Sequence, residues 1–253
     1  MATAFISDCH LSDNSPEMTQ LFCQFLADCS NHADALYILG DFFDVWIGDD
    51  YLGKTEQTII AALQQSRQKG LPIYLMHGNR DFLIGKRFLK NAGCTFLPDE
   101  TVANLYGKPV LLMHGDTLCT ADIAYLKFRR WSRCWFIKKL FLMKSLQTRA
   151  AIAARYRKAS MAHTADTAPE IMDVTPPEVE KKMKKHQVQT LIHGHTHRPA
   201  VHTLSLNNQP AERIVLPAWH QTGGALLFQP DGTHTLVTFQ PKQYRSLFDQ
   251  DPS

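Results

Sequence analysis

The sequence predicts an α/β domain, and two observations support this fold class. Five apolar runs have the composition of buried strands, and amphipathic segments of helical length lie between several of them. Each run is closely followed by residues that can bind a metal ion. The runs are TAFI, ALYIL, PIYLM, PVLLM and QTLI, followed in that order by Asp8 and His10, by Asp41, by Asn79, by His114, and by His195 and His197. Carboxyl ends of buried strands meet at one edge of an open α/β sheet, so we expect these side chains to share one site.

The first half of the chain is expected to alternate strands and helices. In order, the expected elements are a strand at 3–8, a helix at 17–30, a strand at 35–39, a helix at 55–69, a strand at 72–76, a helix near 83–92 and a hairpin of strands at 101–105 and 109–113. The helices are predicted from apolar residues that recur at helical spacing. Gly70 and Gly93 mark the ends of the second and third helices, and Gly107 marks the hairpin turn.

The last third is expected to return to helix and sheet. A helix at 176–186 opens with two prolines, which are favoured in a first helical turn. A strand at 188–192 leads to the sequence HGHTH. Antiparallel strands are expected at 200–206, 212–217, 223–228 and 234–239. Residues 241–253 form a polar tail that we expect to be loose.

Residues 120–167 differ in composition and are expected to form a helical insertion in a core made of residues 1–119 and 168–240. Residues 123–165 contain eleven Lys and Arg and no Asp or Glu. Removing these eleven from the total of 27 leaves 16 basic against 24 acidic residues, so the formal net charge of +3 hides an acidic core. Tryptophan and phenylalanine are interleaved with the basic residues. Interfacial amphipathic helices fit this pattern, and so does a helical hairpin packed on the core with a solvated basic face.

Length and composition fit one large domain with a sizeable core. The six cysteines show no C-x-x-C spacing, and the N-terminus has the pattern of a strand rather than of a signal peptide. We therefore expect free thiols and a reducing cytoplasm. Cys9 lies between Asp8 and His10, and strand alternation would turn it away from them into a buried structural position.

Aspartate, asparagine and histidine together suit Mn, Fe, Zn or Mg ions rather than metals that prefer thiolates. Two such ions about 3.5–4 Å apart can activate water and bind a phosphoryl oxygen together. We assign Asp8, His10 and His197 to the first ion, Asn79, His114 and His195 to the second, and Asp41 as the bridge. Residues two apart on a strand face the same side, so each D-x-H or H-x-H pair is expected to point inward from its strand. The alternative is five ordinary strand-end turns, and the joint occurrence of all five in a workable order argues against it.

The motif order D-x-H, GD, GN-R-D, H-G-D and GH-x-H resembles the calcineurin-like metallophosphoesterase superfamily over roughly residues 3 to 220. This resemblance implies a four-layer α/β/β/α sandwich of two mixed sheets with a dinuclear metal site. Monoesterases of the superfamily usually have histidine after the GN dipeptide, where this chain has Arg80. Arginine can bind a phosphate bidentately but does not donate a proton at neutral pH. The substitution favours a leaving group that needs little protonation, such as a phosphate within a diphosphate.

Longer stretches resemble the UDP-2,3-diacylglucosamine pyrophosphohydrolase family of lipid A biosynthesis. They are YILGDFFDVWIGDD (37–50), HGNRDFLIGKRF (77–88), MHGDTLCTAD (113–122), EIMDV (170–174) and LIHGHTHRPAVH (191–202). The resemblance implies attack of metal-activated water on the α-phosphorus, which yields UMP and 2,3-diacylglucosamine 1-phosphate. It also implies two Mn²⁺ ions, a helical cap that contacts the acyl chains, and a peripheral position on the anionic cytoplasmic face of the inner membrane of Gram-negative bacteria.

The same resemblance implies catalytic roles for Asp41, Asn79, Arg80, His114 and His195. It implies substrate contacts from Asn79, Arg80, Asp122, Ser160, Thr164, Thr167 and His195. For Asp122 and Ser160 the alternative is ordinary helix capping. The chain departs from the family where Asn and Lys are frequent, at Thr164 and Thr167, and at Pro217, where Gly is usual.

Three other functions are less consistent with these patterns. A phosphodiesterase for soluble or cyclic nucleotides would not need a basic, aromatic cap. A binding module with a vestigial site would lack ligands, and here no ligand is missing. Nucleic-acid binding through the basic insertion conflicts with the acidic remainder of the chain. We therefore expect a lipid-linked UDP-sugar as substrate, with no nucleic acid and no obligate protein partner.

Overall fold

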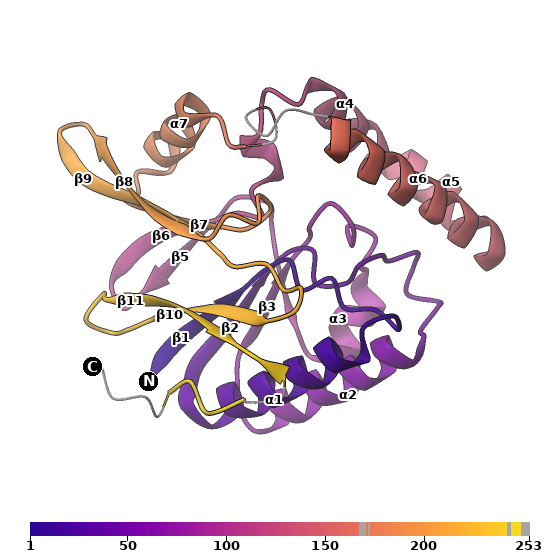
Figure 1. The fold of residues 1–253 in the computed structure, drawn as a ribbon, viewed down its shortest axis with the longest axis horizontal. Coiled ribbons are helices and arrows are strands. Elements are labelled where there is room, and N and C mark those ends of the chain that lie inside the picture. Colours follow the sequence, from indigo (N-terminus) through magenta and orange to yellow (C-terminus); the bar gives the residue numbers. More distant parts are fainter. Residues whose placement is uncertain (167–170, 172, 242–243, 249–253) are drawn as a thin grey trace.

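The computed structural model describes residues 1–166, 171, 173–241 and 244–248, without the side chains of residues 161–166. It is a four-layer sandwich, as predicted (Figure 1). The first sheet has the order β11-β10-β1-β2-β3-β4, and the second has the order β5-β6-β7-β9-β8. Helices α1, α2 and α3 cover the outer face of the first sheet, and α7 covers the outer face of the second.

The elements of the first sheet and its helices have the following bounds. They are β1 (Ala2–Ile6), α1 (Pro16–His32), β2 (Ala33–Leu39), α2 (Lys54–Gln68), β3 (Ile73–Met76), α3 (Lys86–Ala92), β4 (Thr95–Leu97), β10 (Gly223–Phe228) and β11 (His234–Phe239). Strands β1 to β4 are parallel to one another, whereas β10 and β11 are antiparallel. The strand β4 is an addition to the prediction, because three residues are too few for a periodic pattern.

The second sheet consists of β5 (Thr101–Leu105), β6 (Lys108–Leu112), β7 (Thr190–His193), β8 (Ala200–Leu206) and β9 (Gln209–Val215), with α7 at Pro176–His186. Strands β6, β7 and β9 are parallel, and β5 and β8 are antiparallel edges. Both sheets are therefore mixed. The carboxyl ends of β1, β2, β3, β6 and β7 lie at one edge of the sandwich, where the site is expected.

Three apolar clusters fill the three interfaces between the four layers. Alternation along each strand assigns its residues to one interface or the other. Ala4 and Ile6 of β1 face the helices α1 to α3, whereas Phe5 between them faces the second sheet. Leu111 of β6 faces α7, whereas its neighbours face the first sheet.

A short 3₁₀ turn (Asp116–Leu118) precedes the insertion, which forms three helices, α4 (Ile123–Ser132), α5 (Trp135–Leu142) and α6 (Leu146–Asp166). These helices project from the sandwich on the side of the ligand-bearing edge (Figure 1). They expose several large apolar side chains, including Trp131, Trp135 and Met143. Among the described residues, no helix combines the length and apolarity needed to cross a bilayer.

The expectation of a loose tail is wrong for its described part. Asp28 of α1 accepts hydrogen bonds from the Tyr244 hydroxyl (2.8 Å), the Ser246 hydroxyl (2.7 Å) and the main-chain N–H of Leu247 (2.9 Å). Leu247 is buried in the cluster under α1, and Phe248 packs against it. A buried carboxylate thus fixes this segment, and the polar composition of the tail concealed it.

Candidate metal centre

The seven predicted ligands lie on loops at the carboxyl ends of five strands, not on the strands themselves. The strand β1 ends at Ile6, and β7 ends at His193. Five of the seven have left-handed backbone conformations, with φ values of 53° at Asp8, 47° at His10, 49° at Asp41, 70° at His195 and 56° at His197. Strand alternation is therefore the wrong reason for their convergence. A left-handed backbone is costly for side chains of this kind and is found where a site demands it.

Two glycines allow these loops to approach one another closely. A Cβ atom on Gly78 would lie 2.1 Å from both the main-chain nitrogen and Oδ1 of Asp41. A Cβ atom on Gly194 would lie 2.1 Å from Oγ of Ser7 and 2.3 Å from Oδ2 of Asp8. Any larger residue would push the ligand loops apart, so the GN and GH pairs have a steric role as well.

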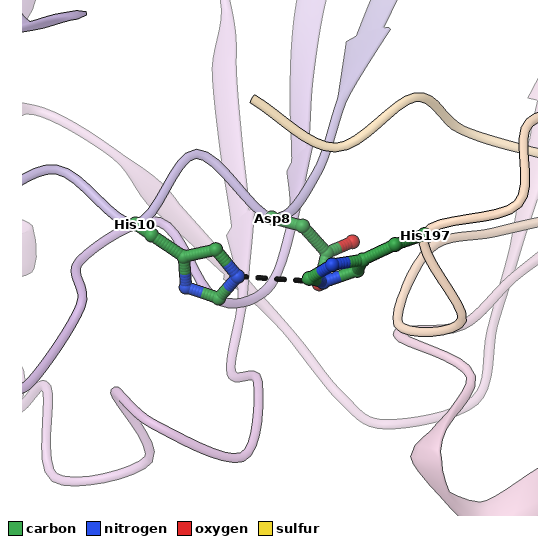
Figure 2. A group of neighbouring side chains, drawn as sticks. All are labelled: Asp8, His10 and His197. Atoms are coloured by element: carbon green, nitrogen blue, oxygen red, sulfur yellow. Dashed lines mark hydrogen bonds and ion pairs between the residues drawn. The ribbon is translucent and has the colours of Figure 1, made fainter. Parts of the chain in front are cut away.

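Asp8, His10 and His197 form one group of potential ligands (Figure 2). Their ligand atoms all lie within 4.8 Å of one another. Nε2 of His10 lies 3.4 Å from Nε2 of His197, and Nε2 of His197 lies 3.3 Å from Oδ1 of Asp8. The first predicted group therefore comes together as expected.

A second group consists of Asp8, Asp41 and His114, whose ligand atoms also lie within 4.8 Å of one another. Oδ1 of Asn79 lies 2.9 Å from Nε2 of His114 and 3.0 Å from Nδ1 of His195. Asp8 thus belongs to both carboxylate–histidine groups, whereas the sequence interpretation gave it to one ion only.

Burial and charge together set the protonation of this centre. Burial lowers the pKa of His10 to about 4, and burial, with the charge of His114, lowers the pKa of His195 to about 4. Burial opposes ionisation of Asp8, but the hydrogen bond from His197 and nearby histidine charges hold its pKa well below the ordinary range. Burial raises the pKa of Asp41. Burial opposes protonation of His114 and His197 as well, but nearby carboxylates raise the pKa of both rings. Metal binding requires neutral imidazoles, so it would displace protons from these two rings.

The donor set fits divalent metal ions. Nδ1 of His114 donates to the carbonyl of Leu39 at 2.9 Å, so Nε2 is the nitrogen that lies 2.9 Å from Oδ1 of Asn79 and would bind a cation after losing its proton. The imidazole nitrogens and carboxylate oxygens that converge in the two groups suit a divalent cation.

Two residues that support the ligands were missed by the sequence interpretation. The hydroxyl of Ser7 donates to Oδ2 of Asp8 at 2.6 Å and leaves Oδ1 of Asp8 facing the site. Asp81, the last residue of HGNRD, accepts main-chain hydrogen bonds from Phe42 at 2.8 Å and Gly78 at 2.7 Å. It therefore joins two ligand loops, and its place at the end of the motif was the available signal.

The buried histidine His193 holds the loop that carries two ligands. Its Nδ1 lies 2.8 Å from the carbonyl of Gly194, and its Nε2 lies 3.2 Å from Nη1 of Arg213. A carbonyl only accepts and a guanidinium only donates, so the ring must be neutral with its proton on Nδ1. The main-chain N–H of Gly194 in turn donates to the carbonyl of His114 at 2.8 Å. His193 was not singled out from the sequence, although it begins the HGHTH motif.

The profile of the calcineurin-like phosphoesterase family matches residues 1–199, more than half of the chain. The chain belongs to the calcineurin-like phosphoesterase family. Its two mixed sheets and four layers agree with the fold that the motif order implied.

Several curated relatives of this calcineurin-like phosphoesterase carry the name UDP-2,3-diacylglucosamine hydrolase. One from Pseudomonas aeruginosa (strain UCBPP-PA14) is 52% identical and covers 92% of this chain and 97% of its own. One from Pectobacterium carotovorum is 48% identical, and the match covers 94% of this chain and 99% of its own. One from Salmonella paratyphi B is 49% identical, with the same coverage.

Arg80 of this phosphoesterase lies beside the predicted bridging carboxylate. Its main-chain N–H donates to Oδ1 of Asp41 at 2.8 Å, and its Nε lies 3.7 Å from Oδ2 of Asp41. Nη1 of Arg80 lies 3.3 Å from Asp44, which is also ion-paired with Arg157 of α6. Two guanidinium groups, one from the core and one from the insertion, therefore converge on Asp44 next to the metal centre.

Much of the basic charge on the insertion faces the core. Arg129 of α4 and Arg133, which caps the end of α4, are paired with Asp99 and with the buried Asp116, which follows His114-Gly115. Arg149 of α6 is paired with Asp50. These partners come from loops of the core, so ion pairs hold the insertion against it. The prediction that this charge serves an anionic surface can apply only to the basic residues that face outward.

The predicted substrate residues of the insertion are described only in part. Asp122 is the N-cap of α4 and accepts a hydrogen bond from the main-chain N–H of Tyr125 at 2.9 Å, in agreement with the capping alternative. Ser160 lies exposed on α6. The side chain of Thr164 and the whole of Thr167 lie outside the described residues.

The loop after β9, which contains Pro217, adjoins the metal centre. Pro217 is buried against Gly224, where a Cβ atom would lie 2.4 Å from its Cγ. Two residues later, the main-chain N–H of Trp219 donates to the carbonyl of Asp8 at 3.0 Å. Pro217 therefore lies in the loop that supports Asp8, a predicted ligand of the first ion, through the hydrogen bond from Trp219.

Proposed function

We propose that this protein hydrolyses the diphosphate bond of UDP-2,3-diacylglucosamine, giving UMP and 2,3-diacylglucosamine 1-phosphate. Relatives that carry the name of this hydrolase match about half of the residues over more than nine-tenths of the chain. The observation that carries the proposal is a centre of two ligand groups that lies beneath a basic and apolar helical insertion. This combination suits a substrate with a diphosphate at one point and lipid chains at another.

The ligand loops would hold two divalent ions through Asp8, His10, Asp41, Asn79, His114, His195 and His197. Such ions lower the pKa of bound water and neutralise phosphoryl oxygens. Mn²⁺ is the ion we propose, because carboxylate, amide and imidazole ligands together suit it. Asp8 lies in both carboxylate–histidine groups, so it is a second candidate, with Asp41, for a shared ligand.

Arg80 positions the phosphoryl group and balances its charge. Its side chain is 29% exposed and lies between Asp41 and Asp44, where an oxygen of the diphosphate could replace a carboxylate as its partner. Arginine keeps its proton at neutral pH, so it stabilises charge and does not act as a general acid. A departing sugar phosphate needs little protonation, which is consistent with this arrangement. We propose attack at the α-phosphorus, on the uridine side.

The outward surface of the insertion would meet the membrane. The side chains of four apolar residues are each at least half exposed: Ile123, Trp131, Trp135 and Met143. Ile123 and Trp131 line an open hollow of about 670 Å³ together with Lys127 and Arg130. Apolar side chains with a basic rim suit the interface of an anionic bilayer. We propose peripheral attachment to the cytoplasmic face of the inner membrane, with no nucleic acid as partner.

The proposal is tested with purified protein, Mn²⁺ or EDTA, and two substrates. UMP release from UDP-2,3-diacylglucosamine that requires Mn²⁺, with little release from a soluble UDP-sugar, supports the proposal. Equal turnover of the soluble UDP-sugar would indicate a broader diphosphatase and would remove the lipid from the function. His114→Ala and Asn79→Ala should each lose bound metal and most of kcat, and full activity with full metal content in either variant would contradict the ligand assignment.

A further inference from the structure

A cleft of about 210 Å³ opens on the outer face of the second sheet, close to the metal centre. Its floor is one face of the β8–β9 ladder, where Ala200 pairs with Val215 and His202 pairs with Arg213. Farther along this ladder, Leu204 and Ala211 pack beneath α7. The helix therefore covers one half of the ladder and leaves open the half nearest the ligand loops.

The walls of the cleft connect it to the metal centre. Thr196 and Arg198 line one wall, and Asp173, which accepts a hydrogen bond from Arg198 at 2.9 Å, also lines the cleft. Thr196 lies between His195 and His197, so the cleft and the metal centre share this loop. Oγ1 of Thr196 is buried and has no hydrogen-bond partner in the described part of the chain. A buried hydroxyl without a partner is costly unless a ligand or water satisfies it.

We propose that this cleft binds the nucleoside end of the substrate, a pyrimidine nucleotide. The inference rests on the proposed function, because a diphosphate that carries both a nucleoside and a lipid-bearing sugar extends in two directions from the metal centre. The helices α4 to α6 lie on one side of the ligand-bearing edge, and β8, β9 and α7 lie on the other (Figure 1). The lipid end belongs beneath the helices, so the nucleoside must extend the other way.

The chemistry of the cleft matches a pyrimidine base and its ribose. Pro199 and Ala200 supply apolar surface for a flat ring. Arg213, His202 and the hydroxyl of Thr196 can donate to ring carbonyls, and Asp173 can accept from a ring N–H or a ribose hydroxyl. A volume of about 210 Å³ is smaller than a pocket for a drug-sized ligand and suits a single ring.

The test compares two ligands that differ only in the nucleoside. UMP and inorganic phosphate would each be titrated into the Mn²⁺-loaded protein by calorimetry. Phosphate reports on the metal centre alone, so the ratio of the two affinities measures the contribution of the nucleoside. We expect UMP to bind the wild-type protein at least about tenfold more tightly than phosphate, a difference of about 1.4 kcal/mol.

Two variants and one matched control locate that contribution. Ala200→Phe fills the cleft from its floor, and His202→Ala removes a polar group without adding bulk. Val201→Phe adds the same ring one residue along β8, on the opposite face of the strand, where the side chain is 47% exposed. Both cleft variants should lower the UMP-to-phosphate ratio about tenfold and raise KM for the UDP-lipid, whereas Val201→Phe should leave the ratio unchanged.

The outcomes separate this inference from the proposed function. A wild-type ratio in both Ala200→Phe and His202→Ala would overturn the cleft assignment, even if the wild-type enzyme releases UMP from the lipid substrate. No UMP release by the wild-type enzyme would overturn the proposed function. If the UMP-to-phosphate affinity ratio fell as much in Val201→Phe as in the two cleft variants, the β8–β9 ladder would be generally disturbed, and the assignment of the nucleoside to the cleft would also be rejected.

Discussion

The guanidinium of Arg133, the C-cap residue of α4, donates a hydrogen bond to the main-chain carbonyl of Gly78 at 2.7 Å. The next residue, Asn79, is a predicted metal ligand. The same guanidinium lies 5.6 Å from the centre of the Phe82 ring, and it is paired with Asp99 at 3.1 Å. A residue of the insertion is therefore hydrogen-bonded to the loop that carries a predicted metal ligand.

Replacing Arg133 should slow catalysis without removing the metals. In Arg133→Ala the carbonyl of Gly78 loses its partner and the loop of Asn79 is less fixed, so we expect kcat for a soluble phosphodiester such as bis(p-nitrophenyl) phosphate to fall about tenfold or more. Metal content, measured by atomic absorption, should stay near that of the wild type. Arg130→Ala is the matched control, because Arg130 lines the outer hollow on the same helix. Equal kcat in the two variants would rule out a role of this hydrogen bond in catalysis.

Removing one acceptor from Asp81 should destabilise the fold itself. Both of its oxygens accept main-chain hydrogen bonds, and the side chain is fully buried. In Asp81→Asn an amide NH₂ would face one of these N–H groups, so we expect the free energy of unfolding to fall by about 2–4 kcal/mol. Urea unfolding in EDTA measures this loss without any contribution from bound metal. Asp99→Asn is the control, because the Asp99 side chain is 44% exposed, and a loss as large as that of Asp81→Asn would contradict the explanation.

The layers and the convergence of the candidate ligands could be predicted because each depends on a local pattern. An apolar strand that ends at a ligand is visible within ten residues, and parallel strands bring such ends to one edge. The backbone conformation of the ligands could not be predicted in this way. Asp8, Asp41 and His197 have positive φ values because neighbouring loops pack against them, and Gly78 and Gly194 leave the required space.

The sequence also could not show which acidic residues form ion pairs with the basic residues of the insertion. Composition shows that the insertion is basic, but not that Asp50, Asp99 and Asp116 of the core would face it. These pairs join residues far apart in the chain, and no periodic pattern connects them. The packing of the C-terminal segment could not be predicted for the same reason, because Tyr244 and its hydrogen-bond partner Asp28 are more than two hundred residues apart.

The hydrogen bonds of His193 lead to a prediction about metal affinity. His193→Gln can still donate to the carbonyl of Gly194 and accept from Arg213, whereas His193→Leu can do neither. Groups that orient metal ligands typically contribute about ten- to a hundredfold to metal affinity. We expect His193→Leu to lose Mn²⁺ affinity by that factor, and His193→Gln to retain most of it, in a competition titration with a metal chelator. Arg213→Met should resemble His193→Leu, and equal affinities in the two His193 variants would show that the ring acts only by filling space.

Glu100 should make the stability of the fold depend on pH. It lies in the loop between β4 and β5, and α7 presents Lys182, Lys185 and His186 to its carboxylate at 2.6, 2.8 and 2.7 Å. Burial opposes ionisation, but these hydrogen bonds outweigh it and lower the pKa of Glu100 from 4.5 to about 2. The folded pKa lies below the unfolded one, so the stabilisation is present above about pH 4.5 and is lost as the pH falls toward 2.

The measurement is the difference in unfolding free energy between the wild type and Glu100→Gln, in EDTA, across this pH range. We expect Glu100→Gln to be less stable by about 1–2 kcal/mol near neutral pH, a figure reduced for solvent screening, and the difference to shrink toward zero at about pH 2. Other acidic groups titrate equally in both proteins, so they cancel in the difference. Glu180→Gln removes an exposed pair with Lys184 on the same helix and should change little at any pH. A difference for Glu100→Gln that stays constant down to about pH 2 would mean that the charge of Glu100 does not link α7 to the loop between the sheets.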